Sequence, residues 1–183
     1  MTKPRLTSKE ITEHLTPPPG ITIPPYPARR DRIYRTSLLV FTFFLAVVGV
    51  GYEVPIKWVG TVGHVGASVA LLVAGWTFLV WLSNWRWLVR SLVIAGAVVA
   101  FFPSLSLLSW AFTLGASAIM AAKETHCFHF WAGRVIPWYA LGVGLSLLVG
   151  MDHIIEGLLW LGMAGLWAAL MAGRLRLPLF VID

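Results

Sequence analysis

One short segment of the chain concentrates side chains that bind metal ions in other proteins. Glu124, His126, Cys127 and His129 lie within six consecutive residues. A neutral imidazole and a thiolate together suit zinc or copper, so these four residues form a candidate metal site. Adjacent side chains diverge by about 100° on a helix, so His126 and Cys127 cannot share a site there without local unwinding. The alternative is that this segment ends a membrane helix and anchors it at the interface.

A second group of polar residues is expected toward the opposite face of the membrane. His64 lies in a glycine-containing stretch, whereas His153 and Glu156 open a later apolar segment. An ionisable residue inside a membrane span is a functional candidate, because burial of its charge is costly. Three glycines beside His64 leave a flat strip that suits close helix packing or a flat macrocycle: Gly60, Gly63 and Gly66.

Three interpretations of this second group remain open. His64 and His153 are possible axial ligands of a tetrapyrrole, either haem or chlorophyll. Alternatively, His64 forms a buried polar pair with Glu156, or bonds Asp152, and joins two helices structurally. The third interpretation is a proton or ion pathway.

Signatures of catalysis are missing from the sequence. We find no serine, cysteine or paired-carboxylate arrangement with the partners that catalysis requires, and no phosphate-binding loop or dinucleotide fingerprint. Hydrophobic residues make up 58% of the 183 residues, charged residues only 12%, and the mean hydropathy is +0.79. This composition is typical of membrane proteins, so we expect a non-catalytic membrane protein.

The elements that must position these residues are membrane-spanning helices. A helix needs about 20 residues to cross the hydrocarbon core, and the apolar segments have such lengths. Pro103 interrupts the longest segment, which is too long for one crossing, so we expect a tight hairpin there. The predicted fold is an all-α bundle of about six transmembrane helices, with spans near 36–54, 58–82, 86–102, 104–122, 135–151 and 154–172.

The distribution of charge predicts the orientation of this bundle. With six spans, thirteen of the fourteen lysines and arginines fall on one side, and only Lys57 falls on the other. Positive charge accumulates on cytoplasmic loops, so both termini and the loop around Lys123 are expected in the cytoplasm. The membrane domain is predicted at 36–176, followed by a short cytoplasmic tail at 177–183.

The first 35 residues form a separate proline-rich, basic tail. It is either solvated or docked on its own membrane domain or on a soluble partner. Basic residues at its end should bind the head groups of anionic lipids. These residues are Arg29, Arg30, Arg32 and Arg35. Because the positive charges cluster at span ends, the net charge of +6 indicates a lipid bilayer as the partner, not nucleic acid.

A motif in the inner loop resembles a known family. The chain reads Lys-Glu-Thr-His-Cys-Phe over residues 123–128, and Tyr34-Arg35 leads into the first span. In these features it resembles an uncharacterised integral membrane protein family of cyanobacteria, other bacteria and plastids. The resemblance implies a bacterial inner membrane or a thylakoid membrane, and with it a role in photosynthesis. It implies no mechanism.

Small residues on the later spans permit close contact between helix backbones. They are Gly115, Ala116, Ser117, Ala118, Gly142, Gly144, Gly150, Gly157, Gly162 and Gly165. The sequence therefore favours an accessory or assembly subunit of a larger membrane complex, which packs against other subunits through these faces. Such a subunit could also hold a tetrapyrrole. The alternatives are a transporter of small solutes or ions, and a haem- or chlorophyll-binding subunit for electron or energy transfer.

Overall fold

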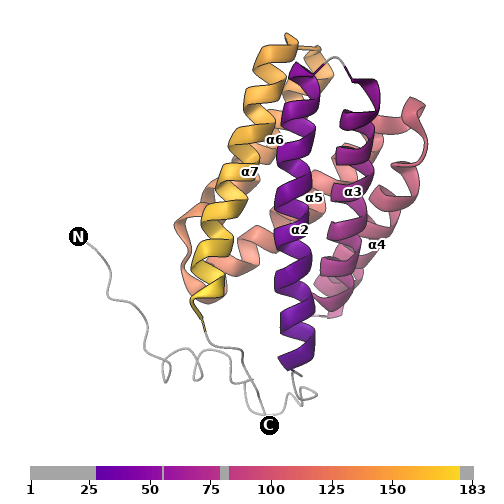
Figure 1. Ribbon diagram of the computed structural model, residues 1–183. Helices are drawn as coiled ribbons and strands as arrows, with labels where there is room; N and C mark the ends of the chain where they lie inside the picture. The colour runs from indigo at the N-terminus through magenta and orange to yellow at the C-terminus, as the bar shows by residue number, and fades with distance from the viewer. Residues whose placement is uncertain (1–27, 55, 79–82, 178–183) are drawn as a thin grey trace.

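The computed structural model describes residues 28–54, 56–78 and 83–177, and these form a bundle of helices (Figure 1). In the described part the long helices are α2 (Ala28–Glu53), α3 (Lys57–Thr77), α4 (Ser83–Val99), α5 (Ser106–Phe128), α6 (Trp131–Val149) and α7 (His153–Leu175). A short 3₁₀ helix, η1 (Pro103–Leu105), precedes α5. The expectation of an all-α bundle of about six helices is confirmed.

Five of these helices are long and apolar enough to cross a membrane: α2, α3, α5 together with η1, α6 and α7. The remaining helix, α4, has 17 residues and carries Arg86 and Arg90 in its first half. Its length is at the lower limit for a crossing. The chain is therefore a multi-pass helical membrane protein.

Successive helices run in opposite directions, so α2 begins and α7 ends at the same end of the bundle (Figure 1). The Pro103 hairpin is confirmed: α4 ends at Val99, and Pro103 occupies the first turn of η1. Proline suits that position because the missing N–H would have no helical partner there. Pro103 therefore lies after the turn that follows α4 and begins the helical segment formed by η1 and α5.

Helix α2 begins at Ala28, so its first two turns lie within residues 1–35, the segment predicted as a tail. The basic residues at the end of that segment are therefore helical. The sequence from Ala28 to Arg35 contains no proline. Asp31 lies in the first turn, where a negative charge interacts favourably with the helix dipole. The expectations for residues 1–27 and 178–183 lie outside the described residues.

Close packing of α2 against α3 and α7 depends on glycine. A Cβ atom built on Gly49 would lie 2.9 Å from the carbonyl oxygen of Gly157 on α7. A Cβ atom on Gly63 of α3 would lie 2.9 Å from the backbone nitrogen of Val48 on α2. Such distances are too short for a side chain, so the three backbones approach one another only because these positions are glycine.

The second half of the bundle is built by α5, α6 and α7. Helix α6 ends at Gly150, which adopts a left-handed conformation with φ of 69°. Asp152 then caps α7 by accepting a hydrogen bond from the Ile154 amide at 2.9 Å. Together these two residues reverse the chain and place Glu156 in the first turn of α7.

The deeply buried tryptophans of the core are Trp110, Trp160 and Trp167. Trp76 differs from these residues, because 54% of its surface is exposed. The guanidinium of Arg90 lies 5.0 Å from the centre of its ring. Trp76 is therefore a surface residue that covers Arg90.

Candidate functional site

A buried cluster of charged side chains joins three helices at the end of the bundle where α2 begins and α7 ends. Arg174 of α7 donates a hydrogen bond to Asp31 of α2 at 2.8 Å. Asp31 also pairs with Arg35, one helical turn further along α2, at 2.6 Å. The Nε atom of Arg174 lies 3.4 Å from Glu124 of α5. One arginine therefore binds carboxylates from two other helices.

Glu124 has further partners that fix its carboxylate. The Tyr34 hydroxyl donates to Glu124 Oε1 at 3.0 Å, and the Lys123 ammonium lies 3.0 Å from the same oxygen. Phe128 covers the cluster, with its ring centre 4.3 Å from the Arg174 guanidinium carbon. Arg35 extends the network by donating to the carbonyl oxygen of Leu177 at 2.8 Å.

Burial makes this ion cluster energetically demanding. Asp31 and Glu124 are completely buried, and Arg174 is 2% exposed. Charges removed from water are stable only when they are paired and hydrogen-bonded. Each carboxylate here has at least two cationic or hydroxyl partners. The cluster consequently fixes the relative positions of α2, α5 and α7, and we call Asp31, Tyr34, Arg35, Lys123, Glu124 and Arg174 the ion cluster.

The structure does not assemble the predicted metal site. The carboxylate of Glu124 is bound to Tyr34, Lys123 and Arg174, whereas His126 and His129 are exposed. No group of three or more His, Cys, Asp or Glu side chains in the described segments is arranged to hold a metal ion. The motif instead supplies Lys123 and Glu124 to the ion cluster, and Phe128 covers it.

His64 is buried on the side of α3 that packs against α5. Its Nε2 atom lies 2.8 Å from the Ser109 hydroxyl, and that hydroxyl donates to the carbonyl oxygen of Gly96 on α4 at 2.9 Å. The imidazole stacks on Trp110, with ring centres 4.2 Å apart and planes 14° apart. Trp110 in turn packs against Trp160 of α7, with the two ring centres 4.1 Å apart. These contacts connect α3, α4, α5 and α7.

The predicted buried pair between His64 and Glu156 does not form. His64 bonds Ser109 instead, and neither carboxylate oxygen of Glu156 has a hydrogen-bond partner among the described residues. His153 is also placed differently from His64, since its side chain is 63% exposed and lies 3.6 Å from Asp152. Asp152 is the N-cap of α7, so His153 is the first residue of that helix and lies at its end, away from the interior.

The contacts around His64 do not favour a macrocycle. Trp110 covers one ring face, and Ser109 occupies the nitrogen that would bind a metal. The glycine strip is filled from α2, because Cβ atoms on Gly63 and Gly66 would collide with Val48 and Phe44. Tetrapyrrole binding through His64 and His153 stays a prediction, which a visible spectrum of the purified protein tests.

The four arginines expected at lipid head groups divide into two kinds. Arg29 and Arg32 are exposed and Arg30 is half-buried, and binding of these three to head groups stays a prediction. Arg35 is only 5% exposed and bonds Asp31 and Leu177. Arg35 therefore belongs to the ion cluster, and its assignment to lipid is corrected.

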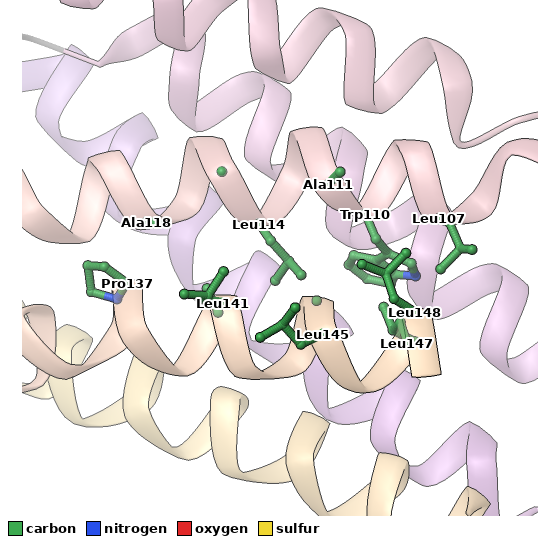
Figure 2. A pocket seen from close by; sticks show the side chains of 13 residues that line it. Leu107, Trp110, Ala111, Leu114, Ala118, Pro137, Leu141, Leu145, Leu147 and Leu148 are labelled. Carbon is green, nitrogen blue, oxygen red and sulfur yellow. The ribbon is translucent and has the colours of Figure 1, made fainter. Parts of the chain in front are cut away.

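An apolar groove of about 400 Å³ runs between α5 and α6. Figure 2 shows Trp110 and Leu114 on one helix and Pro137, Leu141 and Leu145 on the facing helix, with their side chains around the groove. All its lining residues are apolar, and they include Ala111, Gly115, Ala118, Ala140 and Gly144. Trp110 separates this groove from His64.

Sequence reasoning missed Asp31, Arg174 and Ser109 as site residues. Asp31 and Arg35 are four residues apart on a helix, a spacing that brings opposite charges together and is visible in the sequence. Arg174 and Glu124 carried a second signal, because each is a charged residue at the end of an apolar segment. Their pairing across the bundle required the tertiary structure.

Comparison of the chain with models of protein families, with curated proteins and with solved structures found no match.

Proposed function

We propose that the protein is a non-catalytic accessory or assembly subunit of a larger membrane complex, and that it binds a transmembrane helix of another subunit in the groove between α5 and α6. The observation that carries this proposal is the use of glycine in the groove. A Cβ atom added to the glycines that line it would meet almost no other atom of the protein.

The groove glycines differ from those in the bundle interior. A Cβ atom on Gly115 would meet nothing within 4 Å, and one on Gly144 would meet only Leu114, at 3.9 Å. By contrast, a Cβ atom on Gly49 or Gly63 would collide with a neighbouring helix. Glycine costs helix stability, about 1 kcal/mol relative to alanine. Two glycines without an internal role therefore support an external helix that approaches closely at this face.

The chemistry of the groove favours an apolar helix as its occupant. Its rim carries exposed leucines, with Leu141 56% and Leu148 70% exposed. In lipid, helices associate mainly through close packing at small residues, because apolar side chains gain little by leaving the lipid tails. A floor of glycine and alanine between leucine ridges provides that packing surface along α5 and α6.

The test fills the groove and follows the assembly. We would replace Gly144 with leucine and, as the matched control, Gly165 with leucine, since Gly165 is also exposed and open on α7. Native gels of membranes solubilised in mild detergent, followed by mass spectrometry, identify co-migrating proteins. We expect Gly144→Leu to lose the larger assembly and Gly165→Leu to retain it.

Two results would contradict the proposal. The first is wild-type protein that migrates alone or only with its own copies. The second is Gly144→Leu in the same assembly as wild type. A photosynthetic membrane as the setting rests on the resemblance of residues 123–128 alone, and the identity of the co-migrating proteins checks it.

A further inference from the structure

At the end of the bundle opposite the ion cluster, one carboxylate is buried without a partner. Glu156 is 3% exposed, and both of its oxygens are inaccessible and lack a hydrogen-bond partner in the described part of the chain. Buried polar groups in proteins are nearly always hydrogen-bonded, and an ionised carboxylate in such a place is costly. The environment of Glu156 therefore requires an explanation.

The neighbours of Glu156 provide oxygen atoms and aromatic rings. Tyr52 of α2 lies close enough to interact electrostatically with Glu156. Glu53, the next residue, places a carboxylate oxygen 3.0 Å from where a Cβ atom of Gly157 would lie. Trp160 is one turn along α7 from Glu156, and His64 lies behind Trp110, which contacts Trp160. Among the described residues, no lysine, arginine or histidine side chain forms an ion pair with Glu156.

The contrast with Glu124 shows what is missing. Glu124 is equally buried, yet it has Tyr34, Lys123 and Arg174 as partners. An uncompensated carboxylate at a similar burial attracts a small cation, because that neutralises its charge. A single buried carboxylate suits a monovalent ion, whereas divalent ions need several oxygen ligands and usually more than one carboxylate.

We propose that Glu156 is a binding site for an exchangeable monovalent cation, either a proton or Na⁺, at the contact between α2 and α7. Two exposed carboxylates lie near this end of α7: Glu53 beside Gly157, and Asp152 at the N-cap of the helix. This site is independent of the groove between α5 and α6, so either proposal stands if the other fails.

Labelling of the purified full-length protein with dicyclohexylcarbodiimide tests the site. This apolar reagent reacts with protonated carboxyl groups in apolar surroundings, and peptide mass spectrometry identifies each modified residue. We expect Glu156 to react at least about tenfold faster than the exposed Glu53 and Asp152. Label on Glu156 that is unaffected by Na⁺ identifies the proton as the ligand, and label that Na⁺ suppresses identifies Na⁺.

Two variants complete the experiment. Glu156→Gln keeps the shape of the side chain and should remove the fast label, and Glu53→Gln should keep it. Na⁺ should also raise the melting temperature of wild type but not of Glu156→Gln if Na⁺ is the ligand. The proposal is overturned if Glu156 stays unlabelled both with and without Na⁺, or if it reacts no faster than Glu53. Because the wild-type label is read residue by residue, this outcome does not depend on the folding of a variant.

Discussion

Arg174 donates a hydrogen bond to Asp31 at 2.8 Å, although the two residues are 143 positions apart in the sequence. The same guanidinium lies 3.4 Å from Glu124. Helices α2, α5 and α7 therefore meet at one side chain. Loss of its charge would leave two buried carboxylates with fewer cationic partners.

Replacement of Arg174 should strongly destabilise the protein. We expect Arg174→Met to lower the free energy of unfolding by about 3 kcal/mol, because removal of one member of a buried ion pair leaves the other charge uncompensated. Unfolding in detergent micelles, followed by circular dichroism, measures this change. The control is Arg176→Met at an exposed position of the same helix end. Equal stability of the two variants would show that the ion pairs contribute little.

The hydroxyl of Tyr34 should contribute separately to the ion cluster. Tyr34→Phe removes one hydrogen bond to the buried Glu124 and leaves the ring in place. We expect a loss of about 2 kcal/mol, since hydrogen bonds to charged groups are stronger than neutral ones. Tyr139→Phe is the control, because Tyr139 has no carboxylate partner in the described segments. A Tyr34→Phe protein as stable as the control would rule out this contribution.

Ser109 should be essential for the environment of His64. Ser109→Ala leaves His64 Nε2 and the Gly96 carbonyl oxygen without their shared hydroxyl, so we expect about 2 kcal/mol less stability. Ser91→Ala, at an exposed position of α4, should change stability by less than about 0.5 kcal/mol. The same unfolding assay compares them. Similar values for both variants would mean that water replaces the hydroxyl.

Two glycines in one helix should respond oppositely to the same change. In Gly63→Ala the added methyl group meets Val48 of α2, including its backbone nitrogen at 2.9 Å, so α2 and α3 must separate. We expect a loss of about 2 kcal/mol. Gly60→Ala meets open space, and its better helix propensity should leave stability unchanged or slightly raised. Thermal melts of the two proteins decide this, and a stable Gly63→Ala variant would refute the close contact.

The orientation of the bundle can be tested with single cysteines. In a Cys127→Ser background, His126→Cys and His153→Cys place exposed thiols at opposite ends of the bundle. A membrane-impermeant maleimide added to intact cells should label position 153 and not 126, because the charge distribution predicts a cytoplasmic loop at 126. Label at 126 from outside would reverse the topology.

Much of the fold was predictable, because the lipid bilayer constrains helix length and charge distribution so strongly. The hairpin at Pro103 follows from one residue and a length limit. The start of α2 was not predicted, since its first turns are as polar as a solvated tail. Asp31 pairs there with Arg35 and also with Arg174, a partner that the local sequence does not contain.

The candidate site was less predictable for the same reason. Residue type marked Glu124 as a candidate metal ligand and His64 as a candidate buried polar residue, but most of their partners come from other helices. Tyr34 and Arg174 lie beside Glu124, and Ser109 lies beside His64, only because the bundle brings their helices together. The side chain of His126 is exposed, and the metal interpretation of this segment stays a prediction.

The ion cluster can be completed only after the last helix has been synthesised. Asp31 enters the membrane early, whereas Arg174 is translated 143 residues later. Until α7 inserts, the nascent chain carries acidic groups that lack this neutralising partner, and a chaperone or protease can recognise such an unfinished chain. Truncated products that end before Arg174 should therefore be degraded faster than the completed polypeptide.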